Sequence, residues 1–182
     1  GRRGRKTIFV DCDRSFTYQR LAQIANVNVE KVSENVLVFL PETFVEQSSL
    51  VENVENYVTK RLLLIVIDSV TSLYRASFRS VQSIFALNRE LNRQLAYLAQ
   101  VASERGLVIL LTSQVHSQLA SEEAKVEPVA RRILLYWSSV VVNLRPTVRR
   151  NVKLAVLEKH LSRENTNLRS YLTLTERGLT GC

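Results

Sequence analysis

Short runs of aliphatic residues recur along the chain, and each run predicts a buried β-strand. One of them, Leu62–Ile67 (LLLIVI), is apolar at every position, which is typical of a parallel strand covered by helices on both faces. The last two runs predict a hairpin. The predicted strands are Thr7–Asp11, Val36–Leu40, Leu62–Ile67, Leu107–Leu111, Ser139–Leu144, Val152–Glu158 and Ser170–Thr175.

Between these runs, apolar residues recur at helical spacing. The longest such stretch, Ser83–Arg105, ends before Gly106, a residue that suits a helix C-terminus, while Ser117–Pro128 is polar and predicts a loop. The predicted helices are Tyr18–Ala25, Phe44–Lys60, Ser83–Arg105 and Val129–Tyr136. Strands and helices alternate first and strands then follow one another. We therefore expect a single α/β domain over residues 1–182, with a mostly parallel sheet flanked by helices and a C-terminal antiparallel hairpin extension.

The net charge and the cysteines of the chain indicate what kind of partner and which cellular compartment to expect. The chain has 182 residues with 25 Lys and Arg against 17 Asp and Glu, a net charge of +8, which suits a polyanionic partner or simply a soluble basic protein. Cys12 and Cys182 form no disulfide framework, so a reducing, cytoplasmic compartment is expected. The longest aliphatic run is too short to span a membrane.

The strand predicted at Leu62–Ile67 is followed directly by Asp68 and Ser69. A carboxylate at the carboxyl end of a parallel strand lies in the crevice where such sheets bind ligands. There Asp68 could hold Mg²⁺ beside nucleotide phosphates, and Ser69 could add an oxygen to the same shell. The alternative, that Asp68 only caps the following helix, stays equally open.

Two other strand ends carry polar residues. Asp11 and Asp13 end the first strand, and a carboxylate there could orient the water that attacks a γ-phosphate, or be no more than a solvated strand end. Thr112, Ser113 and Gln114 follow the strand Leu107–Leu111, and Gln114 leads into the polar loop. A glutamine at that point suits a sensor of the phosphate or of the attacking water.

The first residues imitate a phosphate-binding loop without forming one. Gly1–Thr7 reads GRRGRKT, but Lys6 follows an arginine where the motif G-x-x-x-x-G-K-[ST] needs glycine. A phosphate loop also follows a strand and opens a helix, whereas a strand comes next here. Because the chain contains no methionine, we expect that its N-terminus is truncated and that the Walker A segment lies upstream.

Four segments in order resemble the archaeal RadA and RadB group of the RecA superfamily. They are FVDCDRSFTYQRLAQIA, IVIDSVTSLYRASF, LNRELNRQLAYLAQVASERGLVILLTSQVHS, and the tail VKLAVLEKHLSRE with YLTLTERGL. The resemblance covers almost the whole chain. It implies a RecA-like fold, ATP and Mg²⁺ as cofactors if the upstream loop exists, and single-stranded DNA as a partner. It also implies association with a RadA-type recombinase or with further copies of the chain.

The resemblance also assigns roles to individual residues. Asp68 matches the Walker B aspartate, Asp13 the catalytic glutamate, and Gln114 the glutamine that couples nucleotide state to DNA binding. Lys159 matches a cation placed against a neighbour's nucleotide, or is a solvated hairpin charge. The two DNA-binding loops correspond to Arg75–Ser83 and Val115–Arg132. Their candidate contacts are Arg75, Arg79, Lys125, Arg131 and Arg132.

The sequence departs from the family pattern in ways that leave three functions open. Asp13 is one methylene shorter than glutamate, and the second loop has Ala130–Arg132 where relatives have glycine, together with the acidic Glu122, Glu123 and Glu127. The expected function is an ATP-dependent, DNA-binding ATPase of homologous recombination and repair. The alternatives are a non-catalytic paralogue that regulates RadA-type filaments, and a KaiC-like regulatory ATPase.

Overall fold

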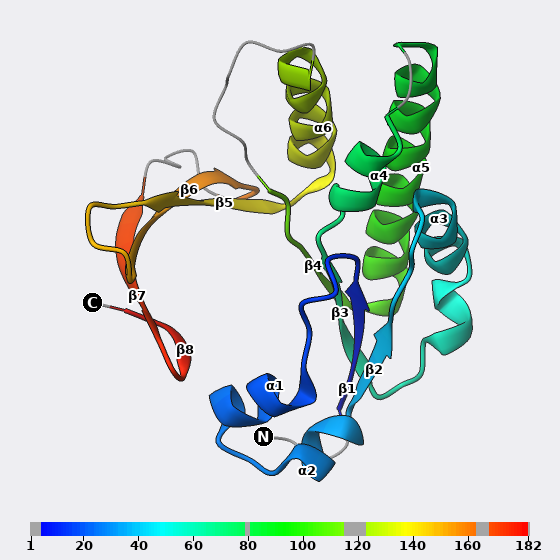
Figure 1. Ribbon diagram of the computed structural model, residues 1–182. Coiled ribbons are helices and arrows are strands. Elements are labelled where there is room, and N and C mark those ends of the chain that lie inside the picture. The colour runs from blue at the N-terminus through cyan, green and yellow to red at the C-terminus, as the bar shows by residue number, and fades with distance from the viewer. Residues whose placement is uncertain (1–4, 79–80, 115–122, 163–167, 182) are drawn as a thin grey trace. The chain divides into compact units, whose positions relative to one another are not determined.

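The computed structural model describes residues 5–78, 81–114, 123–162 and 168–181, with side chains described from residue 130 in the last helix. The chain divides into two compact units. The first unit contains residues 1–16 and 33–137, and the second contains residues 17–32 and 138–182. Figure 1 labels the α-helices and β-strands of both units, which are described separately below.

A four-stranded parallel sheet in the order β2-β1-β3-β4 forms the centre of the first unit. Its strands are β1 (Lys6–Asp11), β2 (Val36–Phe39), β3 (Leu62–Asp68) and β4 (Val108–Leu111). Its helices are α3 (Phe44–Glu52), the 3-10 helix η1 (Val54–Tyr57), α4 (Ser72–Ala76), α5 (Val81–Arg105) and α6 (Glu123–Trp137). Parallel strands need helical crossovers between them, which explains the alternation along the chain.

The core lies between one face of this sheet and two helices. Ile8, Ile65 and Ile67 point to this face and are at most 2% exposed, and they join a cluster that includes Leu91 and Leu95 of α5. Figure 1 shows α3 and α5 side by side on this face. The leucine spacing of α5 thus buries one stripe of the helix against the sheet.

Local caps fix the ends of these two helices. The Thr43 hydroxyl accepts a hydrogen bond from the Glu46 amide at 3.1 Å and caps α3 at its N-terminus. Gly106 follows α5 with φ of +63°, a left-handed conformation that favours glycine, and the Leu107 amide donates to the Ala102 carbonyl at 3.0 Å. The chain therefore turns directly from α5 into β4.

The other face of the parallel sheet is apolar but partly exposed. On β4, Val108 is 63% and Leu110 is 51% exposed, and the outer edge of this strand pairs with no strand in the described ranges. On β1 of the same face, Phe9 packs against Phe16 with ring centroids 4.6 Å apart. All-parallel sheets are normally covered on both faces, so the exposure of Val108 and Leu110 sets this face apart from the buried one.

The second unit is a four-stranded antiparallel sheet in the order β5-β6-β7-β8, with two helices. Its elements are α1 (Tyr18–Ala25), α2 (Val29–Ser33, which ends in the first unit), β5 (Val140–Pro146), β6 (Val152–His160), β7 (Arg169–Thr175) and β8 (Gly178–Gly181). Arg20 of α1 donates to the carbonyl oxygen of Glu176 at 2.7 Å, which ties α1 to the β7–β8 turn.

The α/β fold with a parallel sheet, helices and C-terminal antiparallel strands is confirmed, but several element predictions were wrong. The stretch Phe44–Lys60 forms two short helices rather than one, since the chain breaks at Asn53. The last helix begins at Glu123 rather than Val129, six residues inside the predicted loop. The C-terminal antiparallel strands, which were predicted, form a sheet of their own, whereas α2, α4 and β8 were not predicted.

Candidate nucleotide and magnesium site

The carboxyl ends of β1, β3 and β4 meet at one edge of the parallel sheet. Asp11 lies opposite Asp68 in the strand register. Backbone hydrogen bonds continue beyond the strands, from the Cys12 amide to the Asp68 carbonyl at 2.7 Å and from the Val70 amide to the Thr112 carbonyl at 3.0 Å. The three strand ends are therefore held together by main-chain contacts before any side chain is considered.

Side chains from these strand ends reach one another as well. Thr112 donates its hydroxyl proton to a carboxylate oxygen of Asp68, and the Gln114 amide nitrogen lies 3.5 Å from a carboxylate oxygen of Asp13. Asp13 and Gln114 are exposed, so both can meet a ligand. Asp13, Asp68 and Gln114 were predicted to share a crevice; the structure joins Gln114 directly to Asp13, while Asp68 bonds to Thr112 at the neighbouring strand end.

The two carboxylates of the first strand end differ in kind. Asp11 is 1% exposed, and its two oxygens accept hydrogen bonds from the backbone amides of Ser15 at 3.0 Å and Phe16 at 2.9 Å. This carboxylate closes the turn that follows β1. Asp13 is exposed, so it is the carboxylate of the pair that a ligand can reach.

Ser69 is the residue of this site whose bonding is incomplete. It is 2% exposed, and its hydroxyl oxygen has no hydrogen-bond partner within the part of the chain that the structure describes. A buried hydroxyl without a partner costs about 1–3 kcal/mol. The peptide bond between Asp68 and Ser69 is cis. An orphaned oxygen beside a carboxylate at a ligand-binding edge suits a site that completes its bonding when a ligand is present.

The side chains at this edge suit Mg²⁺ better than they suit a metal ion that takes all of its ligands from the protein. Among the described residues, no group of three or more His, Cys, Asp or Glu side chains could ligate a metal ion. Mg²⁺ does not need such a group, because it usually keeps several waters and binds one or two carboxylates together with substrate phosphates. Asp68, with the Ser69 hydroxyl beside it, meets that requirement.

The remaining predicted residues are distributed over both units. Arg75 lies in α4, and Arg131 and Arg132 are exposed on α6. Lys125 lies in α6 without a described side chain, and Arg79 lies outside the described residues. Lys159 lies on β6 in the second unit. Their predicted DNA and nucleotide contacts stay predictions.

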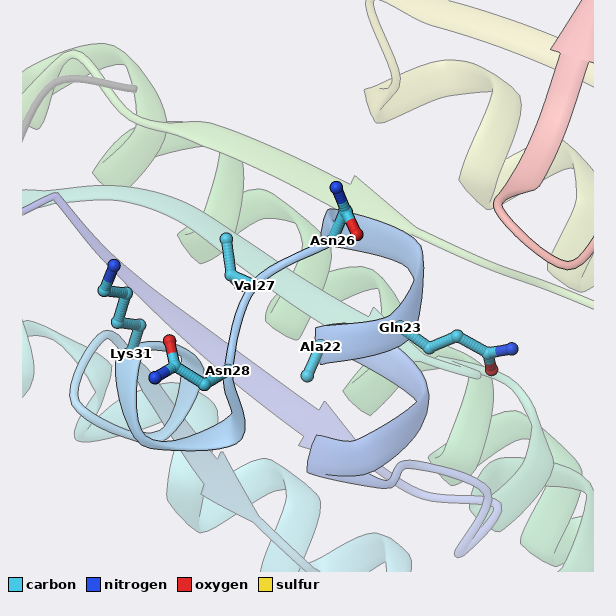
Figure 2. Close-up of a pocket in the computed structure, with 6 residues that line it drawn as sticks. All are labelled: Ala22, Gln23, Asn26, Val27, Asn28 and Lys31. Atoms are coloured by element: carbon cyan, nitrogen blue, oxygen red, sulfur yellow. The ribbon is translucent and has the colours of Figure 1, made fainter.

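A surface hollow in the second unit is a weaker candidate. It has a volume of about 490 Å³ and is lined by Ala22, Gln23, Asn26, Val27, Asn28 and Lys31. Figure 2 shows these side chains on α1, α2 and the link between them, with Gln23 pointing away from Lys31. Its polar side chains do not converge on one point, in contrast to those at the edge of the parallel sheet.

No helix among the described residues combines the length and the apolar character that crossing a membrane requires.

Sequence reasoning missed two buried polar side chains, one of which contacts the ends of β1 and β3. Gln47 of α3 and Gln94 of α5 are 0% and 1% exposed, and they hydrogen-bond to each other at 3.0 Å. Each glutamine falls within a predicted helix. The one signal that could have found them is that both occupy positions on the apolar stripe of that helix.

The parallel sheet, its helices on one face and the polar residues at its carboxyl edge define a RecA-like α/β core. Comparison with known proteins gives the family. The Rad51 family model matches residues 1–170, and the chain belongs to the Rad51 family. This assignment supports the predicted kinship with RadA and RadB recombinases over the KaiC-like alternative.

The similar proteins are RadB proteins. The chain is 32% identical over 168 residues to the DNA repair and recombination protein RadB of Methanococcus maripaludis, covering 91% of this chain and 74% of that protein. It is 31% identical over 179 residues to RadB of Thermococcus kodakarensis, covering 97% and 78%. A crystal structure of the RadB recombinase matches with a TM-score of 0.76 at 27% identity, over 97% of this chain and 78% of that one.

Proposed function

We propose that this chain is the core of a Mg²⁺- and ATP-dependent DNA-binding protein of homologous recombination and repair. The observation that carries the proposal is the pairing of Asp13 with Gln114 and of Asp68 with Thr112 at the carboxyl edge of one parallel sheet. Open α/β sheets bind ligands at this edge. The names of the RadB relatives, which are DNA repair and recombination proteins, support the process.

Each residue of the edge has a part in this proposal. Asp68 would hold Mg²⁺, with the Ser69 hydroxyl completing its bonding in the same shell. A bound Mg²⁺ would neutralise charge on the nucleotide phosphates. Asp13 would accept a hydrogen bond from the attacking water and orient it, and Gln114, in contact with Asp13, would detect whether the γ-phosphate is present.

The 182 residues contain no G-x-x-x-x-G-K-[ST] motif, so the proposal for ATP rests on the side chains at the carboxyl edge of the parallel sheet. The proposed RecA-like core domain covers residues 1–182.

Single-stranded DNA is the proposed polyanionic partner. Arg75, Arg79, Lys125, Arg131 and Arg132 are its candidate contacts. Charge supports a second contribution, because the second unit holds ten Lys and Arg against four Glu, which is +6 of the net +8 of the chain. Contacts of this kind weaken steeply with salt because they release counterions.

A second candidate function is regulation without catalysis, by docking on a RadA-type recombinase or on further copies of this chain. Asp13 supports it, because a carboxylate one methylene shorter than glutamate reaches less far toward the attacking water. Glu122, Glu123 and Glu127 support it too, because they place negative charge in the segment proposed to meet phosphates.

ATP turnover by the complete protein, with and without single-stranded DNA, tests the first proposal. We expect DNA-stimulated turnover that Asp68→Ala abolishes and that Glu104→Ala, a change of an exposed carboxylate on α5, leaves intact. Turnover that is absent in both conditions, or insensitive to Asp68→Ala, rejects the ATPase. A stoichiometric complex with a RadA-type filament in sedimentation would then support the regulatory function.

A further inference from the structure

Two fully buried amide side chains lie beneath the proposed site. Gln47 projects from α3 and Gln94 from α5, and they are 0% and 1% exposed. Burying an amide is costly unless all of its polar atoms find partners. An apolar side chain of similar volume, such as methionine, would fill the same space without that requirement, so the bonds that these amides make are informative.

Gln47 bonds to both strand ends that carry the carboxylates. Its oxygen accepts a hydrogen bond from the Cys12 thiol at 3.5 Å, and its nitrogen donates to the Val70 carbonyl at 3.2 Å. Cys12 directly precedes Asp13, and Val70 is two residues beyond Asp68. One side chain therefore spans from the end of β1 to the end of β3.

Gln94 fixes Gln47 from the opposite side. Its oxygen accepts from Gln47 at 3.0 Å, and its nitrogen donates to the Ser48 hydroxyl at 2.6 Å and to Glu90 at 3.3 Å. Glu90 in turn pairs with Arg93 at 2.7 Å, and this hydrogen bond lowers the pKa of Glu90. The network thus runs continuously from the ends of β1 and β3 to an ion pair on α5.

We propose that Gln47 is a positioning residue that sets the separation of the strand ends bearing Asp13 and Asp68, with Gln94 holding it in place. The metal-binding part of this inference rests on the proposed function. The positioning part rests on the contacts alone. A satisfied buried network specifies one arrangement of its neighbours, which an apolar contact of the same volume does not.

Amide hydrogen exchange on the whole chain tests the positioning. The variants are Gln47→Met and Gln94→Met, and the matched control is Gln100→Met, which changes an exposed glutamine of α5 that donates to Glu104 at 2.8 Å. We expect exchange to accelerate about tenfold in residues 9–14 and 67–72 of Gln47→Met. The β5–β8 sheet and the control should keep the parental rates.

A second measurement, binding of Mn²⁺ alone followed by its electron paramagnetic resonance signal, connects the positioning to the site. We expect affinity about tenfold weaker in Gln47→Met and unchanged in Gln100→Met, since changes to residues that orient metal ligands typically cost 10–100-fold. Should Gln47→Met fail to fold, Gln94→Met keeps the Cys12 and Val70 bonds of Gln47 and should give a smaller acceleration in the same two segments.

The outcomes separate the two proposals. Two results overturn the positioning role, because the network would then serve packing only. One is unchanged exchange in residues 9–14 and 67–72. The other is an acceleration that extends evenly to β2 and to the C-terminal turns of α5. Faster exchange confined to the two strand ends, in a parent chain that binds no Mn²⁺, supports the positioning role and counts against the proposed metal site.

Discussion

Replacing Ser69 by alanine should stabilise the ligand-free protein and weaken its site. The Ser69 hydroxyl is buried, with 2% of the residue exposed, and it is without a partner in the described part of the chain. Ser69→Ala removes this one oxygen and little volume. Residues that serve a ligand are often costly to the free protein, and Ser69 has the bonding of such a residue.

The magnitude follows from the state of that oxygen. A buried hydroxyl without a hydrogen bond costs about 1–3 kcal/mol, and deleting the atom also removes some van der Waals attraction. The net gain should be about 1 kcal/mol in the free energy of unfolding. For a chain of this length, that gain corresponds to a rise in Tm of about 2–4 °C.

Urea denaturation followed by circular dichroism, with and without Mn²⁺, measures both effects. The control is Ser77→Ala, because the Ser77 hydroxyl donates to the Leu73 carbonyl at 2.8 Å and its loss should cost about 0.5–1.5 kcal/mol. Without metal, Ser69→Ala should unfold at higher urea than the parent, and Ser77→Ala at lower urea. With Mn²⁺ well above the dissociation constant, the parent should gain more than Ser69→Ala.

A loss of stability in metal-free Ser69→Ala would refute the reasoning, because the hydroxyl would then have a bonding partner in the free protein. Equal stabilisation of the parent and of Ser69→Ala by Mn²⁺ would refute the predicted weakening of the site, since the Ser69 hydroxyl would then take no part in binding the metal.

Two further predictions concern DNA and the buried thiol. In the double variant Arg131→Ser/Arg132→Ser, the slope of log affinity for fluorescent oligo-dT against log salt concentration should fall by about 1.4, which is about 0.7 for each phosphate that an arginine no longer neutralises. The control Arg61→Ser, at the amino edge of the sheet, should keep the parental slope. Equal slopes in the parent and the double variant would exclude a DNA contact by both arginines. In Cys182→Ser, Cys12 should resist Ellman's reagent at pH 8 until guanidinium unfolds the chain, because burial raises its pKa from 9.0 to about 12. As pH rises, the thiol of the unfolded chain loses its proton first. Its contribution to the free energy of unfolding should therefore fall between about pH 9 and 12, which urea titrations measure. Rapid labelling of Cys12 in the native protein at pH 8 would contradict its burial.

The hydrophobic pattern was a good guide to the parallel sheet because its strands are buried runs. Leu62–Ile67 was predicted almost to the residue, and so was α1 at Tyr18–Ala25, where Thr17 and Asn26 cap both ends. The pattern failed where apolar spacing continues through a break. At Asn53 the chain leaves α3, yet valines on both sides keep helical spacing, so periodicity alone predicted one helix.

The polar residues at the strand ends could be predicted from the sequence, but the buried side chains that contact these strand ends could not. An aspartate that follows an aliphatic strand is visible in sequence, and Asp68 was found in this way. Asp11 and Asp13 look equivalent in sequence. Only the structure of the turn that follows β1 shows that both oxygens of Asp11 accept hydrogen bonds from backbone amides. The sequence shows only that Gln47 falls on the apolar stripe of a predicted helix; its partners at Cys12 and Val70 are set by tertiary contacts and could not be predicted.

The geometry of the site depends on strand register more than on any single functional residue. Asp11 lies opposite Asp68 because Ile8 pairs with Ile65 and Val10 with Ile67 along the same two strands. A slip of one residue would turn the aliphatic side chains of one strand to the opposite face and carry its carboxylate away from the edge. Burial of these side chains therefore fixes the register, and the register brings the carboxylates together. Substitutions far down β1 or β3 that disturb packing should consequently weaken metal binding without touching a ligand.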